Sequence, residues 1–422
     1  MSSTEDNRLN MKVLLINQYA GNKGDRAVLY AMCNMLIRNY PDCQIVVSTS
    51  SPELWQDYPF YEKNCIRFIP SAWDYVRIKP RGLYWKLLNA LKKYTFTILR
   101  ETTLRRINIC KFISNPEFYK SVKEADGVIS VGGHHYTTIL SRDLVSSINF
   151  DASIAVTLNK LICFSQSFGP FNFYNKRNRL FTTSILGQCL LLCPRENSST
   201  EELKNLHLGK VQIHRTFETV ISLNKEFSEY VAIENRPCKI GIAIYCTQYR
   251  SPIERLQYIK TISDFSEFLI HRGYGVVFFP MELKNSAPDD RPMIHEIIGQ
   301  ISTKDAVEII DEDLQTLDHL RRIADCRLFV GHKTHSTIFA LATGTPLIGI
   351  AYHPKTIEFM RMYGVEEYAI DDKILSFDLL KEKFLQIEPL LSEIGVRCNT
   401  MSRKFADKIE QDFLYAIGLF QK

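Results

Sequence analysis

The sequence lacks the features that mark several common protein classes. Its eleven cysteines are scattered, their number is odd, and none of them forms a C-x-x-C pair. Several lie in apolar runs such as "LICFSQS", which favours reduced, buried thiols over a disulfide framework or a zinc site. No stretch of 18 uncharged apolar residues occurs, so we expect no membrane-spanning helix.

Targeting and nucleotide-binding signals are also missing. The opening "MSSTEDNRLNMKVLLIN" is polar and acidic before it becomes apolar, unlike a signal peptide. We therefore expect a cytoplasmic protein, peripheral at most to the inner face of the plasma membrane. A G-x-G-x-x-G fingerprint and a P-loop are absent, so nucleoside-triphosphate chemistry is not indicated. We find no repeats and no low-complexity segment.

What is present is an alternation of short apolar runs and amphipathic segments. The chain has 422 residues, of which 45% are hydrophobic. A chain of this length is too long for one ordinary hydrophobic core and suits two domains. The pattern predicts an α/β fold of two Rossmann-like domains, each with a parallel sheet, facing a central cleft. The expected parts are residues 1–228 with a basic excursion at 77–112, residues 229–399, and a C-terminal helix at 400–422.

The expected strands and helices place polar residues at strand ends. Strands are predicted in both halves, at 11–19, 43–50, 126–136, 161–171, 189–197, 238–246, 274–282, 327–333 and 345–352. Helices are predicted at 26–40, 258–273, 313–326 and 335–344. Because ligands of open parallel sheets bind at the carboxyl ends of strands, we expect the functional residues in the loops just after them.

The densest set of such residues is "GHKTHSTIFALATGTPLIGIAYHPKTIEFM" at 331–360. Lys333 and His335 follow a strand, Ser336 opens a helix, and His353 and Lys355 follow the next strand. A helix start, lysines and an imidazole together suit a phosphate or carboxylate and a proton transfer. The alternative is that His335 and Ser336 are ordinary capping residues and Lys333 is a solvated charge.

This run resembles the C-terminal signature of the polysaccharide pyruvyltransferase family, which has a GT-B-type architecture. Lys333 stands where the family usually has arginine, and His353 where it more often has aspartate; lysine keeps the charge but loses the bidentate fork. Four further segments resemble family landmarks in the right order. They are "NKGDRAVL" (22–29), "VGGHHY" (131–136), "SQSFGPF" (165–171) and "CPRENSSTEEL" (193–203).

The resemblance implies a site for phosphoenolpyruvate, a co-substrate, with no organic cofactor and no metal. Donor-binding residues are then Arg195, Lys333, His335, Ser336 and Lys355, with His335 as general acid and Arg195 as its catalytic partner. For Arg195, a salt bridge to Glu196 or Glu201 is the alternative. Acceptor-binding residues are expected in two loops: Asn22, Gly24, Asp25, Gly132, Gly133, His134 and His135. Asp25 can also be a helix N-cap, and the two histidines ordinary polar loop residues.

The segment 77–111 has the most uneven charge in the chain. It holds ten Lys or Arg and one acid, Glu101, interleaved with aromatic and aliphatic residues. Such a segment suits an anionic membrane or a diphosphate head group, although it can also be a solvated helix face. We expect no nucleic-acid partner, because no nucleic-acid module accompanies the charge.

The resemblance therefore implies transfer of pyruvate from phosphoenolpyruvate to a sugar, forming a ketal in capsule or exopolysaccharide biosynthesis. The acceptor is expected to be galactose, N-acetylmannosamine or another hexose on a lipid-diphosphate oligosaccharide. Two alternatives stay open. One is a nucleotide-sugar glycosyltransferase of the same architecture, in which Glu358 would face the ribose, and the other is a non-catalytic scaffold in polysaccharide assembly.

Overall fold

The computed structural model describes residues 11–18, 21–55, 58–72, 82–84, 87, 110–112, 114–138, 147–173, 176–246, 251–283 and 289–421. The chain divides into two compact units. The first comprises residues 1–20, 28–218 and 410–422, and the second residues 21–27 and 219–409. The predicted excursion at 77–112 lies outside the described residues except for 82–84, 87 and 110–112.

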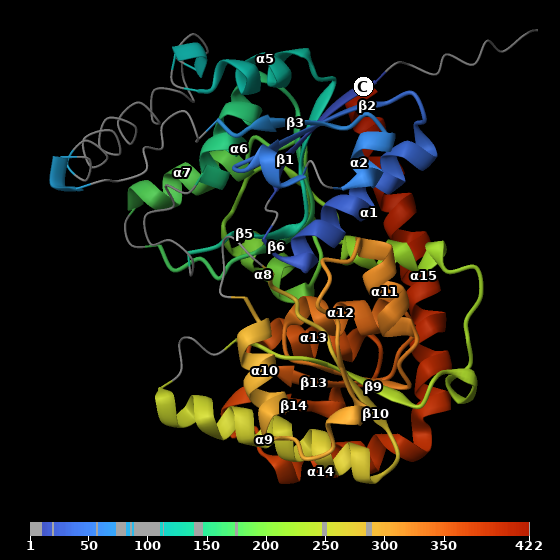
Figure 1. Cartoon of the computed structure of the whole chain (residues 1–422). Helices are drawn as coiled ribbons and strands as arrows, with labels where there is room; N and C mark the ends of the chain where they lie inside the picture. Colours follow the sequence, from blue (N-terminus) through green and yellow to red (C-terminus); the bar gives the residue numbers. More distant parts are fainter. Residues whose placement is uncertain are drawn as a thin grey trace, which may run out of the picture. The chain divides into compact units, whose positions relative to one another are not determined.

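The first unit is a parallel sheet with helices on its faces (Figure 1). Its strands are β1 (Lys12–Gln18), β2 (Gln44–Thr49), β3 (Arg67–Pro70), β4 (Gly127–Ser130), β5 (Gly133–Tyr136), β6 (Leu161–Phe168), β7 (Leu191–Pro194) and β8 (Gln212–Ile213). Its helices are α1 (Lys23–Asn39, whose first turn belongs to the second unit), α2 (Pro59–Lys63), α5 (Pro116–Glu124), α6 (Ser147–Leu158), α7 (Lys176–Leu186) and α8 (Asn197–Asn205).

The second unit repeats this plan. Its strands are β9 (Lys239–Ala243), β10 (Gly275–Phe278), β11 (Val307–Ile309), β12 (Leu328–Gly331), β13 (Leu347–Ala351) and β14 (Ala369–Asp371). Its helices are α9 (Pro252–His271), α10 (Arg291–Gln300), α11 (Thr316–Ala324), α12 (Thr334–Ala342), α13 (Pro354–Met362), α14 (Phe377–Ile387) and α15 (Leu391–Gly418, whose end belongs to the first unit).

The strand orders identify both sheets as Rossmann-like. The described strands of the second sheet run β11-β10-β9-β12-β13-β14, which is the doubly wound order 3-2-1-4-5-6. Those of the first run β3-β2-β1-β4-β6-β7-β8, with β5 pairing β6. All named strand pairs are parallel. The order reverses between β1 and β4 and between β9 and β12, which is where ligands bind in such sheets.

Local sequence explains where the helices begin. Ser251 and Glu254 form a reciprocal capping box at the start of α9, and Asn115 and Ser376 cap α5 and α14 with their side chains. At α13, the ring of His353 accepts the amide of Lys355, and Pro354 occupies the first turn. These caps satisfy amides that would otherwise lack partners.

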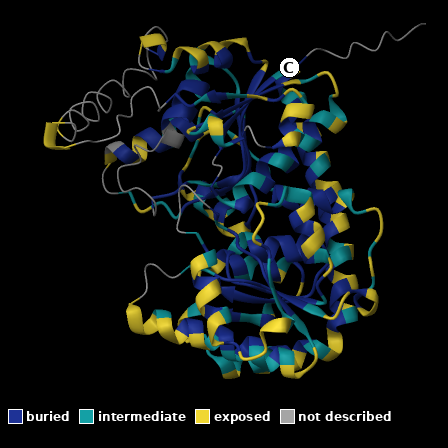
Figure 2. Cartoon of the chain, viewed as in Figure 1, coloured by how far each residue is buried: buried dark blue, intermediate teal, exposed yellow. Residues whose placement is uncertain are grey.

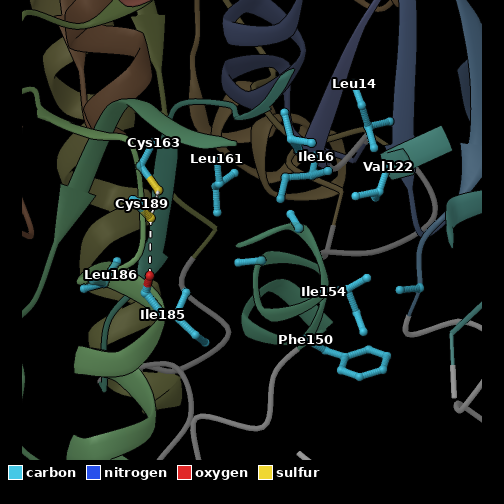
Figure 3. Close-up of a cluster of buried hydrophobic side chains, with 14 of the residues drawn as sticks. Leu14, Ile16, Val122, Phe150, Ile154, Leu161, Cys163, Ile185, Leu186 and Cys189 are labelled. Atoms are coloured by element: carbon cyan, nitrogen blue, oxygen red, sulfur yellow. Dashed lines mark hydrogen bonds between the residues drawn. The ribbon is translucent and has the colours of Figure 1, made fainter. Parts of the chain in front are cut away.

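The central strands β1, β4, β6, β7, β9, β12 and β13 are almost entirely buried, whereas the edge strands β8 and β11 are only partly so, and most helices expose one face (Figure 2). In the first unit, β1 and β6 pack against α5, α6 and α7 through aliphatic side chains (Figure 3). The sulfurs of Cys163 and Cys189 lie 3.8 Å apart in this core. All eleven cysteines fall within the described residues and are free thiols. No described helix has both the length and the apolar content to cross a bilayer.

Three details differ from the sequence predictions. The segment 126–136 forms two strands, β4 and β5, rather than one. The units divide after Glu218 rather than after residue 228, because the 3-10 segment Thr219–Glu226 packs against α12. The last helix begins at Leu391, nine residues before the expected start at 400, and its final part from Glu410 packs into the first unit.

Candidate functional site

The carboxyl edge of the second sheet gathers the donor-site candidates. Lys333 follows β12 at the point where strand order reverses and is the N-cap of α12. The helix begins at Thr334, so Ser336 lies inside its first turn, where its buried hydroxyl donates to the carbonyl of Lys333 at 2.7 Å. Ser336 is therefore not the first residue of the helix, as the sequence predicted, but stabilises its first turn through this hydrogen bond. His335 lies between them in the same turn, half-buried.

A second helix start lies beside the first. The hydroxyls of Thr334 on α12 and Thr356 on α13 are 3.1 Å apart. Lys355, in the first turn of α13, is 8% exposed. Two helix N-termini, each with a partial positive charge, thus converge beside a buried lysine. This arrangement favours a small anion.

Lys333 is compensated by acids that the sequence did not single out. Its ammonium lies 2.9 Å from Glu282 and 3.1 Å from Asp290, which is fully buried. Burial raises the pKa of Asp290, and the charge of Lys333 opposes that rise. The same ammonium lies 5.6 Å from the ring centroid of Tyr245. Lys333 is therefore part of a structural network rather than a solvated cation.

The motif around Asn22 lies in the same unit and meets this network. Asn22 forms a β-bridge with Glu282, and its amide Nδ2 donates to the carboxylate of Glu282 at 3.4 Å. Gly24 is buried against the ring of His335. Asp25 lies in the first turn of α1. The structure thus brings Asn22 and Gly24, expected to contact the acceptor, next to donor-site candidates.

Lys23 is a buried cation that sequence reasoning passed over. Its ammonium lies 3.3 Å from Asp313, which also accepts two hydrogen bonds of 2.7 Å from Arg26. Burial, set against the attraction of Asp313, lowers the pKa of Lys23 to about 8. Its position inside "NKGD" was the available signal, but its burial and its acid partner depend on the fold.

His332 is a second residue that the site predictions left out. It is fully buried at the end of β12. Its Nδ1 lies 2.8 Å from the hydroxyl of Tyr258 and its Nε2 3.0 Å from the carboxylate of Asp372. Asp372 directly follows β14, so the fold aligns a tyrosine, an imidazole and a carboxylate at this sheet edge. The sequence placed His332 with Lys333 and His335 at the end of an apolar strand, but no role was predicted for it.

The first unit holds the remaining candidates, at the ends of β4, β6 and β7. Arg195 is 3% exposed, and its guanidinium contacts Glu218, Glu196 at 3.5 Å and the hydroxyl of Ser167 at 2.8 Å. The salt bridge to Glu196 that the sequence allowed is present. Glu218, far along the chain, was not anticipated.

Gly132 and Gly133 pack closely against other residues of the first unit. A Cβ at Gly133 would lie 2.2 Å from Nε2 of His135, and one at Gly132 would lie 2.8 Å from the carbonyl of Ser165. Ser165 itself has a left-handed φ of 54°. Nε2 of His134 lies 2.6 Å from the carbonyl of Gly169. The two glycines thus allow close packing within the protein.

His135 lies near Arg195. Burial, with the positive charge of Arg195 added, lowers the pKa of His135 to about 4, so its imidazole is neutral at pH 7. Its Nε2 is buried, and within the described residues no hydrogen-bond partner reaches that atom. In the same described part of the chain, no three His, Cys, Asp or Glu side chains are grouped to hold a metal ion.

The model of the family described as polysaccharide pyruvyl transferase matches residues 22–354. The chain belongs to this family. The match begins at Asn22, in the motif that contacts His335, and ends at Pro354, the first residue of α13, so it contains the strand ends of both sheets described above. It spans well over half of the chain and both units, which supports a transferase assignment for the whole protein.

Relatives of this pyruvyl transferase family member agree with its place in polysaccharide chemistry and with its fold. The amylovoran biosynthesis protein AmsJ of Erwinia amylovora is 23% identical over 97% of this chain and 100% of its own. The UDP-GlcNAc 2-epimerase of Neisseria meningitidis has a TM-score of 0.56 at 11% identity, over 97% of this chain and 100% of its own. S. aureus MnaA has a TM-score of 0.56 at 12% identity, over 98% of each chain. The fold is therefore of the GT-B type.

Proposed function

We propose that this pyruvyl transferase uses phosphoenolpyruvate to form a pyruvate ketal on a sugar of an extracellular polysaccharide precursor. The observation that carries the proposal is the sheet edge of the second unit, where the N-termini of α12, which carries His335, and of α13, which carries Lys355, lie side by side. Phosphoenolpyruvate is a small molecule with a phosphate and a carboxylate, which such a positive edge would bind. Family membership supports the reaction class.

The proposed anion ligands follow from the local charges. Lys333 faces two carboxylates, so its charge is largely compensated. We propose that the amides that open α12 and the positive end of α13 are the main contributors to anion binding, and that Lys333 contributes by fixing the start of α12. That Arg195 also contacts the donor stays a prediction, as do the acceptor roles of Gly132, Gly133, His134 and His135.

The proposed chemistry uses His335 as a general acid. It protonates C3 of phosphoenolpyruvate, and a sugar hydroxyl adds to C2. Phosphate then leaves, and a second hydroxyl of the same sugar adds to C2 and closes the ketal. The two hydroxyls release two protons: one restores the imidazole and the other leaves with phosphate. The positive helix starts stabilise the phosphate as its charge develops.

The test measures phosphate release from phosphoenolpyruvate in the presence of galactose- or N-acetylmannosamine-containing lipid-diphosphate oligosaccharides. We expect acceptor-dependent release from the wild-type protein and a loss of about 100-fold or more in His335→Ala, as is typical for a missing general acid. His271→Ala on the exposed face of α9 is the matched control. Near wild-type turnover in His335→Ala would remove His335 from this role.

Binding measurements on the same purified protein distinguish the proposed pyruvyl transfer from the two alternatives, a nucleotide-sugar glycosyltransferase and a non-catalytic scaffold. Thermal shifts with phosphoenolpyruvate and with UDP-sugars report which donor binds, because a ligand of the native state raises its stability. A shift with UDP-sugars alone would favour a glycosyltransferase, with Glu358 on α13 as the residue to vary. Binding of neither, and no turnover, would favour a scaffold.

We also propose that residues 77–111 bind an anionic membrane and so bring the protein to a lipid-linked acceptor. Within this segment, the described residues Leu83, Tyr84 and Leu87 are 74%, 68% and 64% exposed. Exposed apolar side chains beside many cations are what an anionic lipid surface attracts. Sedimentation with anionic vesicles tests this, and the same protein with zwitterionic vesicles is the control. Absence of binding to anionic vesicles would contradict the proposal.

A further inference from the structure

The backbone of Gly24 lies so close to the imidazole of His335 that a residue with a Cβ atom could not fit at position 24. A Cβ built on Gly24 would lie 2.2 Å from Cγ, 2.3 Å from Nδ1 and 2.6 Å from Cβ of His335. Real Cβ atoms essentially never approach neighbours to within 3.0 Å. The backbone of Gly24 therefore covers the Nδ1 side of the ring, and only glycine leaves room for it.

The loop that carries Gly24 is anchored, so it cannot easily retreat from the ring. The amide of Lys23 donates to the carbonyl of Met281 at 3.1 Å, next to the β-bridge between Asn22 and Glu282. The side chain of Asn22 accepts the amide of Gly24 at 2.6 Å and shapes the turn.

Ion pairs fix the other side of this loop. Asp313 pairs with both Lys23 and Arg26, which flank Gly24 on either side. The ring of Phe339, on the next turn of α12, also lies near the imidazole, with its centroid 6.5 Å from that of His335. His335 is thus confined between an anchored loop and its own helix.

We infer that Gly24 is a positioning residue that sets the orientation of the His335 imidazole. The inference rests on the proposed function, in which His335 moves a proton, and it replaces the expectation that Gly24 contacts the acceptor sugar. A proton donor must lie within hydrogen-bond reach of the atom it protonates. A displacement of about 1 Å is enough to cost about 100-fold in rate.

The kinetic test substitutes Gly24→Ala. We expect kcat to fall by about 10- to 100-fold because the ring or the loop must move. The KM for the acceptor should change less than about twofold, because the substitution alters proton transfer and not sugar binding. The pH at which kcat is half-maximal should shift as well. Gly299→Ala in α10 is the matched control, since nothing lies within 4 Å of a Cβ at that position.

A stability test reports the contact without any assay of turnover. In the wild-type background, Gly24→Ala should lower the Tm by about 3 °C or more. In a His335→Gly background, which removes the ring and its Cβ, the same substitution should lower the Tm by less than about 1 °C. The difference is the coupling between the two positions.

The two tests separate failure of the inference from failure of the proposed function. Equal Tm losses in both backgrounds, or a wild-type kcat in Gly24→Ala, would overturn the positioning role. Full turnover in His335→Gly would instead overturn the proposed role of His335, while the Tm coupling would persist.

Discussion

At the scale of single residues, two cations predicted to bind the donor, Lys333 and Arg195, form ion pairs with neighbouring carboxylates. Lys333 occupies a position where family resemblance suggested an anion contact, yet two carboxylates lie within 3.1 Å of its ammonium. Arg195 is likewise held by Glu196 and Glu218. Removing either cation would leave buried negative charge, which is far more costly than losing a surface ion pair.

Lys333→Met should therefore lower the free energy of unfolding by about 3–5 kcal/mol, because Asp290 and Glu282 lose their shared counterion. Urea unfolding followed by circular dichroism measures the loss. Lys333→Arg keeps the charge and should lose much less. Lys260→Met, in an exposed pair with Asp264, should change stability by about 0.5 kcal/mol or less. A loss from Lys333→Met no greater than that of Lys260→Met would contradict the network.

At the scale of elements, α15 links the two units. It was expected at 400–422 as a separate terminal helix, but it runs from Leu391 to Gly418 and its final part belongs to the first unit. Phe413 is fully buried there, with its ring centroid 5.4 Å from that of Phe164 on β6. Asp412, also buried, lies 2.7 Å from Nε2 of His214.

Phe413→Ala should lower the free energy of unfolding of the first unit by about 3–5 kcal/mol, since it leaves a cavity beside β6. Leu414→Ala, one residue further along the helix and 38% exposed, should cost less than about 1 kcal/mol. Urea unfolding of both variants measures the difference. Equal losses would show that the end of α15 does not hold the first unit together.

The sequence predicted most of the central strands because apolar runs and turn residues are local signals, but it did not predict the edge strands β3, β8, β11 and β14 or the helices α5, α6, α7, α8, α10, α13 and α14. The strand at 11–19 and the helix at 313–326 were confirmed as β1 and α11 with small shifts at their ends. The contact between Gly24 and His335, by contrast, joins distant parts of the chain. Glu282 and Glu218 were missed for the same reason, because no periodicity marks an acid that becomes the partner of a remote cation.

At the scale of the whole molecule, each compact unit contains a histidine whose imidazole is neutral at pH 7. Burial, together with the charge of Arg195, lowers the pKa of His135 in the first unit to about 4. Burial, together with the charge of Lys23, lowers the pKa of His319 in the second unit well below its usual value. Each imidazole gains its proton more easily when its unit unfolds.

Both units should therefore lose stability as the pH falls from about 6.5 toward about 4, by up to about 3 kcal/mol for His135. The sign follows because the unfolded chain binds more protons than the native one in this window. Calorimetry at several pH values measures how steeply the free energy of unfolding falls with pH. This dependence should be weaker in His135→Gln and in His319→Leu than in the wild-type protein. The wild-type protein is the reference, and slopes in both variants equal to that of the wild type would contradict the assignment.

The return of residues 410–422 to the first unit has a consequence for biosynthesis. Residues 219–409, which form most of the second unit, are synthesised before residues 410–422, so throughout their translation the nascent first unit lacks the segment that covers β6. The hydrophobic surface around β6 stays open during that time. Chaperone occupancy on translating ribosomes should accordingly persist over the first unit until residues 410–422 have emerged.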